Sequence, residues 1–284
     1  MAHMPVATLD PFFLDAPNGR LFAVHHRPTD ITSIRGHVLC VPPFNEEMNR
    51  CRSMVTLQAQ AFAQLGIGTL LLDLHGTGDS AGNYVDARWQ IWQDNIRAAV
   101  NWLNKQPGGC RGLWGIRLGA ILAGEALKSI DLPSAAFIAW QPVVDGKQHF
   151  TQFLRMRIAA QMERPHLPKE TTHSMREQFA AGKSLEVSGY EIHAEFAAAL
   201  DAARLEAFSP TANIPVLWLE QAAPDATQAA PVNQKVIDAW RAGGANIDVR
   251  FFEGPNFWQV AERAISTSAI DATTAWAKQT WPSQ

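Results

Sequence analysis

Short apolar runs alternate with longer stretches of helical periodicity through the first half of the chain. The apolar runs have the length of strands, and the most apolar of them suit strands that are covered on both faces. They are residues 21–26, 36–41, 69–74, 110–114 and 135–140. Apolar positions recur near α-helical spacing in the stretches between them, at residues 52–64, 86–103 and 118–129. This order predicts a parallel sheet with helices on both faces, joined by right-handed crossovers.

The pattern changes after residue 145. Residues 146–209 are mostly polar, with helical spacing and a short extended segment near 185–190. Strand patterns resume at 215–220 and 247–252, with a helix at 232–243 between them and a final helix at about 260–278. We therefore predict a core formed by residues 1–145 and 210–284, with residues 146–209 as a helical lid after the sixth strand. Such a lid would cover the carboxyl ends of the strands, where ligands bind in α/β sheets.

Composition and charge exclude several classes of protein. The chain has 284 residues, of which 47% are hydrophobic, enough for one large core. A net charge of −3 gives no reason to expect a nucleic acid partner, and no run reaches the roughly 18 apolar residues of a membrane span. Cys40, Cys51 and Cys110 lack metal-ligand spacing, so we expect reduced thiols, a cytoplasmic location, and no metal or cofactor. The oligomeric state stays open.

One five-residue segment, Gly115-Ile116-Arg117-Leu118-Gly119, carries most of the functional signal. It lies between a predicted strand and a predicted helix, and it has the frame of a nucleophile elbow, a strained turn flanked by glycines. Arg117 stands where the nucleophile belongs. Because a guanidinium stays protonated and has no lone pair, it cannot attack a substrate. The segment predicts a hydrolase-like turn that carries an anion-binding side chain.

Five stretches form a specific combination: PPFNEEMNR at 42–50, DLHGTGDSAG at 73–82, WGIRLGA at 114–120, WQPVV at 140–144 and GPNFW at 254–258. Together with the order of elements, they resemble the α/β-hydrolase superfamily over nearly the whole chain. More narrowly, they resemble the family called exosortase A system-associated hydrolase 2. The resemblance implies an α/β-hydrolase fold, with a mostly parallel eight-stranded sheet flanked by helices and a helical lid after strand 6. It also implies a link to bacterial exopolysaccharide production and protein sorting.

The catalytic triad of that superfamily is incomplete in this sequence. Its order is serine, acid, histidine, with the histidine on the loop after the last strand. None of the nine histidines lies there, and Asn256 stands in the expected place. Glu220 and Asp225 are both candidates for the acid position. A second segment, Gly78-Asp79-Ser80-Ala81-Gly82, matches the serine motif, but it lies inside a loop, so we interpret Ser80 as a turn residue.

Two interpretations of Arg117 remain open. At a helix N-terminus it would bind a carboxylate, phosphate or sulfate of a ligand. Alternatively, it forms an internal salt bridge to Glu46, Glu47, Glu220 or Asp225, because buried charges are usually paired. If Glu46 or Glu47 faces the pocket, it could act as a general acid or base with His75 as its partner.

These observations lead to three hypotheses. We expect a small-molecule binder for an anionic, acyl or carbohydrate ligand, without serine-esterase chemistry. The alternative is a non-standard hydrolase in which Arg117 stabilises negative charge while Glu46 or Glu47 acts with His75. A non-catalytic interaction scaffold is the third. The residues proposed for catalysis are Arg117, Glu46, Glu47, His75, Asn256 and Asp225. The residues proposed to contact the ligand are Phe44, Asn45, Ile116, Leu118, Trp140, Gln141 and Trp258.

Overall fold

A computed structural model describes residues 8–30, 32–132, 135–162, 169–223 and 226–282. Its centre is an eight-stranded sheet with the strand order β1-β2-β4-β3-β5-β6-β9-β10. β1 and β2 pair antiparallel, β2 joins β4 antiparallel, and the remaining neighbours are parallel. The strands are β1 Leu9–Ala16, β2 Gly19–His26, β3 Gly36–Val41, β4 Ile67–Leu72, β5 Cys110–Ile116, β6 Ala136–Trp140, β9 Val216–Gln221 and β10 Ile247–Phe252.

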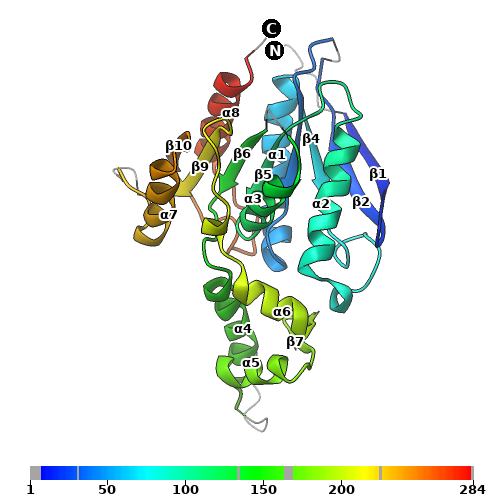
Figure 1. Ribbon diagram of the computed structural model, residues 1–284, viewed down its shortest axis with the longest axis vertical. Helices are drawn as coiled ribbons and strands as arrows, with labels where there is room; N and C mark the ends of the chain where they lie inside the picture. Colours follow the sequence, from blue (N-terminus) through cyan, green and yellow to red (C-terminus); the bar gives the residue numbers. More distant parts are fainter. Residues whose placement is uncertain (1–7, 31, 133–134, 163–168, 224–225, 283–284) are drawn as a thin grey trace.

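Helices cover both faces of this sheet (Figure 1). The helices α1 Glu46–Gln64 and α8 Thr267–Thr280 pack together on one face. The helices α2 Trp89–Leu103, α3 Gly119–Ser129 and α7 Pro231–Ala242 contribute to the hydrophobic cluster on the other face. β3, β5 and β6 lie between the two layers, which explains why their sequences are mostly apolar rather than alternating.

An insertion separates β6 from β9. It contains α4 Gly146–Met162, α5 Thr172–Ala180, the short antiparallel pair β7 Leu185–Val187 and β8 Tyr190–Ile192, α6 Ala194–Ala202, and a 3₁₀ turn at Leu205–Ala207. Figure 1 shows these elements at one end of the molecule, below the sheet in this view. Since α4 begins soon after β6 ends at Trp140, the insertion lies at the carboxyl ends of the parallel strands.

Aromatic rings join the insertion to the core. Phe44, in the loop after β3, lies 5.1 Å from Phe153 of α4 and 6.3 Å from Phe196 of α6, measured between ring centroids. Phe196 also lies 4.7 Å from Trp92 of α2. These side chains are buried, and such edge-to-face contacts add to the stabilisation that burial provides. The insertion is therefore packed as part of the main core.

The largest differences from the elements expected from the sequence are one missed strand and the starts of two helices. The amphipathic edge strand β1 was not among the predicted strands. α1 begins at Glu46 and not at residue 52, because the acidic residues Glu46 and Glu47 form its first turn. α8 begins at Thr267 and not at residue 260, since the hydroxyls of Ser266 and Ser268 both donate to the carbonyl oxygen of Glu253 and hold this loop against β10.

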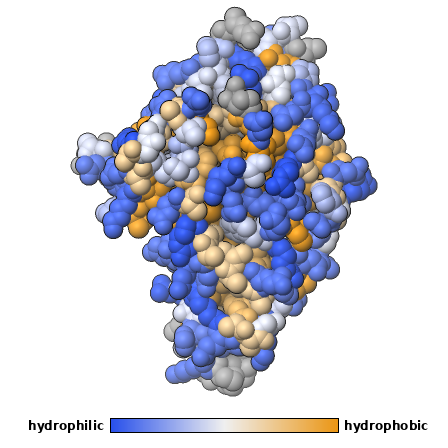
Figure 2. Space-filling view, viewed as in Figure 1, coloured by the Kyte–Doolittle hydropathy of each residue, from blue (hydrophilic) through white to orange (hydrophobic). Residues whose placement is uncertain are grey.

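Much of the surface in the view of Figure 2 is hydrophilic, with smaller hydrophobic areas among the polar side chains. Within the described ranges, no helix is long and apolar enough to cross a membrane.

Candidate functional site

The turn between β5 and α3 has the geometry of a nucleophile elbow. Arg117, at its centre, has a φ of 54°, a left-handed conformation that L-residues with a Cβ atom adopt at a cost of about 1–2 kcal/mol. The flanking glycines are required by close packing. A Cβ atom at Gly115 would lie 2.4 Å from the Cα of Ala120, and one at Gly119 would lie 2.4 Å from the carbonyl oxygen of Pro42. The packing around the turn therefore leaves no room for a side chain at either glycine.

Arg117 has an acidic partner inside the protein. Its Nε donates to Oε1 of Glu47 at 3.2 Å, and its Nη1 donates to the carbonyl oxygen of Gln141 at 3.1 Å. The guanidinium carbon lies 5.1 Å from the ring centroid of Trp258, within the range of a cation–π interaction. Of the two interpretations of Arg117, the internal salt bridge is present, with Glu47 as the partner. Nη2 makes no hydrogen bond to any described residue and is left for another acceptor.

Glu47 and His149 form the second part of the cluster. Oε2 of Glu47 is buried without a hydrogen-bond partner in the described part of the chain, and it lies 3.9 Å from Nε2 of His149. Burial raises the pKa of Glu47, although the Arg117 cation opposes this shift. Burial, together with Arg117, lowers the pKa of His149 to about 3, so its imidazole is neutral near pH 7. A buried carboxyl group, a neutral imidazole and a guanidinium therefore lie side by side.

A cavity of about 120 Å³ opens beside this cluster. Polar groups line it from three elements: Glu46, Glu47 and Arg50 from α1, Gln152 from α4, and Gln259 from the loop after β10. Apolar walls are formed by Phe44, Phe153, Met156 and Trp258. The volume is large enough for several non-hydrogen atoms. Its mixed lining suits a small ligand with one polar end and one apolar end.

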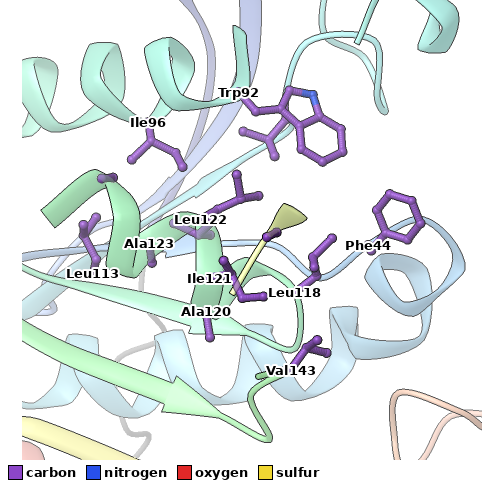
Figure 3. Close-up of a cluster of buried hydrophobic side chains, with 14 of the residues drawn as sticks. Phe44, Trp92, Ile96, Leu113, Leu118, Ala120, Ile121, Leu122, Ala123 and Val143 are labelled. Carbon is purple, nitrogen blue, oxygen red and sulfur yellow. The ribbon is translucent and has the colours of Figure 1, made fainter. Parts of the chain in front are cut away.

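The loop after β3 is held in a specific conformation. Asn45 precedes α1 with a φ of 51°, and its Oδ1 accepts a hydrogen bond from the hydroxyl of Tyr84. Across the described residues, the backbone N–H groups of Phe44 and Leu118 donate no hydrogen bond. Figure 3 shows Leu118 and Ile121 on the side of α3 that faces Phe44. Two backbone N–H groups therefore remain without an acceptor among the described residues, one in the turn and one in the loop after β3.

Several residues proposed for ligand contact have a packing role. Ile116, Leu118 and Trp140 are at most 1% exposed and do not line the cavity, and the Trp140 indole donates to Thr273 at 2.9 Å. Gln141 contributes its carbonyl oxygen to Arg117, while its side-chain Oε1 accepts from the backbone of Gln221 at 2.6 Å. Phe44 and Trp258 do line the cavity.

The proposed partnership between Glu46 or Glu47 and His75 does not occur among the described residues. No hydrogen bond or ion pair joins His75 to either glutamate, and His75 does not line the cavity. The backbone of His75 is fixed instead by Asn95 and by the indole of Trp92. His149 of α4 takes the place beside Glu47. His149 was not among the residues predicted from the sequence, because a histidine in a polar helix carries no signal of the direction in which it points.

The remaining triad positions are arranged as follows. The side-chain amide of Asn256 donates to Gln259 at 3.2 Å and does not line the cavity, whereas its neighbours Trp258 and Gln259 do. Glu220 is buried and accepts hydrogen bonds from Trp218, Ala230 and Asn233, so it is not the partner of Arg117. Asp225 lies outside the described residues.

Ser80 has the hydrogen bonds of a turn residue. Its hydroxyl donates to the carbonyl oxygen of Asp73 at 2.6 Å and accepts from the backbone N–H of Phe22 at 2.8 Å. Both bonds join the loop to β2 and to the end of β4, which supports the interpretation made from the sequence.

Comparison with solved structures identifies the fold. The ferulic acid-bound form of Est1E from Butyrivibrio proteoclasticus superposes with a TM-score of 0.61 at 16% identity, over 94% of this chain and 96% of that chain. A carboxyl esterase from Bacillus coagulans superposes with a TM-score of 0.63 at 12% identity, over 96% and 99%. An α/β serine hydrolase from Xanthomonas campestris gives 0.56 at 14%, over 97% and 96%. The chain has the α/β-hydrolase fold. No protein-family model and no curated protein matches it.

Backbone N–H groups at two places have a known role in enzymes of the α/β-hydrolase fold. In enzymes of this fold, the oxyanion hole is formed by the N–H of the residue after the nucleophile and an N–H from the loop after the third strand of the core. In this chain Leu118 follows the centre of the turn, and Phe44 lies in the loop after β3. Within the described ranges, no group of three or more His, Cys, Asp or Glu residues could hold a metal ion. The charged and titratable groups beside the turn include the guanidinium of Arg117, the carboxyl group of Glu47 and the imidazole of His149.

Proposed function

We propose that the protein binds a small organic anion in the cavity beside the elbow and does not use the covalent serine route. The observation that carries this proposal is Arg117 itself, which replaces the nucleophile and whose Nη2 has no hydrogen-bond partner among the described residues. Nη2 has two N–H donors, and the backbone N–H groups of Leu118, in the turn, and of Phe44, in the loop after β3, add two more. An anionic oxygen at this position would satisfy donors that are otherwise unpaired.

The apolar walls support an aromatic or aliphatic substituent on the anion. Phe44, Phe153, Met156 and Trp258 line the cavity together with its polar groups. Est1E binds ferulic acid, an aromatic carboxylic acid, on the same fold. Small aromatic carboxylates are therefore suitable first probes. The resemblance to the exosortase-associated family further suggests a ligand from bacterial exopolysaccharide production or protein sorting.

We also propose that residues 146–209 act as a lid. α4 contributes His149, Gln152, Phe153 and Met156 to the cavity, so the site is complete only when the insertion is packed against the core. Three buried free cysteines, Cys40, Cys51 and Cys110, agree with a cytoplasmic location.

Titration calorimetry with benzoate and ferulate tests the binding proposal. Wild-type protein and the control variant Ser80→Ala should both bind, because Ser80 has a structural role. Arg117→Met should lose binding while its far-UV circular dichroism stays unchanged. A fluorophosphonate probe should label none of the three. Ester hydrolysis that disappears in Ser80→Ala, or labelling of Ser80, would overturn the proposal.

A non-standard hydrolase is the second candidate, favoured by the unpartnered Oε2 of Glu47 and the two free N–H groups. In this case Glu47, aided by His149 and not by His75, would take a proton from water that attacks a bound carbonyl, while the N–H groups stabilise the negative charge on its oxygen. Slow turnover of p-nitrophenyl acetate that is lost in Glu47→Gln and retained in Ser80→Ala would support this alternative. Equal background hydrolysis in both variants would exclude it.

A further inference from the structure

Glu47 is the counter-ion of Arg117 at the proposed anion site. Its Oε1 lies 3.2 Å from Nε of Arg117, and the two side chains are 16% and 13% exposed, so the pair is largely shielded from water. A second anion arriving at Nη2 of the same guanidinium would share one positive charge with the Glu47 carboxylate. Two carboxylates at one cation repel each other strongly in a shielded site, and the usual solution is that one of them takes a proton.

The groups around Glu47 indicate where such a proton would go. Oε2 is buried and has no hydrogen-bond partner within the described residues, whereas Oε1 is held by Arg117. The charged and titratable groups near Glu47 are Arg50 and Cys51 of α1, Arg117 of the turn, and His149 of α4. Burial raises the pKa of the Cys51 thiol, which stays protonated, and it lowers that of His149, which stays neutral. Neither group competes with Oε2 for the proton near pH 7.

Glu46 is the other acidic side chain at the cavity, and it is engaged elsewhere. Its Oε1 accepts a hydrogen bond from the hydroxyl of Tyr190 at 2.9 Å, and no ion pair joins it to Arg117 in the described part of the chain. Glu46 therefore provides a matched comparison with Glu47, since it carries the same charge one position earlier in the same helix and cavity.

We propose that the cavity takes a monoanionic carboxylate together with one proton, which Oε2 of Glu47 receives, so that the protein binds its ligand as a weak acid. The inference rests on the proposed anion-binding function. The proton comes from the solvent buffer or from the carboxylic acid itself, and no other bond forms or breaks. Before binding, Arg117 is paired with the Glu47 carboxylate. Afterwards it is paired with the ligand carboxylate, to which the new O–H of Glu47 can donate a charge-assisted hydrogen bond.

This coupling makes the affinity depend on pH in a defined direction. Above the pKa of Glu47 in the free protein, each ligand bound requires the uptake of one proton. The association constant should therefore fall about ten-fold for each unit that the pH rises. A neutral ligand of the same shape has no charge to compensate and should bind without proton uptake.

The test is titration calorimetry of the intact protein with benzoate, in buffers of different ionisation enthalpy, at about pH 8. Wild-type protein and Glu46→Gln should take up close to one proton for each benzoate bound. Glu47→Gln should bind benzoate more tightly at this pH, with no proton uptake and no fall in affinity as the pH rises. Benzamide should show no proton uptake with any of the three proteins.

The outcomes separate this inference from the function on which it rests. If benzoate binds neither wild-type protein nor folded Glu47→Gln, the anion-binding proposal fails. If benzoate binds wild-type protein with no proton uptake and an affinity independent of pH, anion binding stands and proton coupling is wrong. Proton uptake that persists unchanged in Glu47→Gln would also refute the role of Glu47. Thermal unfolding of each variant confirms that it is folded.

Discussion

The ion pair between Arg117 and Glu47 permits a quantitative prediction about stability. Replacing Arg117 with methionine removes the cation but retains a long side chain against Trp258. Breaking a fully buried ion pair costs about 3–5 kcal/mol, because the remaining charge is left uncompensated. Since 13% and 16% of the two side chains remain exposed, the lower end of that range applies, about 3 kcal/mol. The lost hydrogen bond to the carbonyl oxygen of Gln141 adds about 1 kcal/mol.

A double-mutant cycle separates the ionic part of this loss. In the Glu47→Gln background, Arg117→Met leaves no carboxylate without its cation. The exchange should then cost only about 1–2 kcal/mol, from the lost hydrogen bond to Gln141 and the lost cation–π contact with Trp258. The coupling energy between the two positions should be about 2 kcal/mol or more. Urea denaturation of wild-type protein, both single variants and the double variant measures it. Glu46→Gln is the matched control, and its coupling to Arg117→Met should be smaller.

The pH dependence of the loss gives a second check on the same variants. Burial already raises the pKa of Glu47, and the removal of Arg117 takes away the cation that opposes this shift. The folded variant then binds a proton more readily than the unfolded chain, so its stability falls as the pH rises. The destabilisation by Arg117→Met should therefore be larger at about pH 8 than at about pH 5, with a slope of at most about 1.4 kcal/mol per pH unit. A loss that is equal in both backgrounds and constant with pH would refute the ion pair as described.

Three further predictions concern the scaffold. Gly119→Ala should destabilise the fold by about 3 kcal/mol or abolish it, because the new Cβ would meet the carbonyl oxygen of Pro42. Gly182→Ala, with open space around it, should cost only about 1 kcal/mol of backbone strain, and urea denaturation measures both losses. Burial lowers the pKa of His25 from 6.5 to about 4. The unfolding free energy should therefore fall by about 3 kcal/mol as the pH drops from 6.5 to about 4. An unfolding free energy that stays constant over this pH range, measured by urea titration, would contradict the prediction. Ser80→Ala should lower the unfolding free energy by about 1–2 kcal/mol while benzoate affinity, measured by calorimetry, stays the same.

The fold could be predicted from the sequence because its strands are sandwiched between two helical layers. β3, which lies inside the sheet and is buried along its whole length, begins and ends at the residues where the apolar pattern places it. β1 could not be recognised in the same way, since it lies at the edge of the sheet and most of its residues are exposed or only partly buried. Hydrophobic periodicity reports burial, and β1 has too little of it.

The sequence predicted the part of the site whose backbone conformation depends on residues that are neighbours in the chain. The turn around Arg117 was evident from two glycines between a strand and a helix. The contact between Glu47 and His149 joins the first turn of α1 to α4, about a hundred residues later in the chain, and no spacing rule reports such a contact. The choice of Glu47 over Glu46 as the partner of Arg117 likewise depends on side-chain directions in a helix whose start was placed too late.

The turn at residue 117 also defines an unusual position for chemical modification of the protein. Its left-handed backbone is enforced by the glycine contacts on either side, so every L-residue with a Cβ atom at the centre bears a similar conformational cost and emerges in the same direction. A single exchange such as Arg117→Cys would place a thiol in the cavity, near Glu47 and His149, without altering the frame that holds it. The same backbone could thus present a cation, a nucleophile or a covalently attached reporter group at one fixed point.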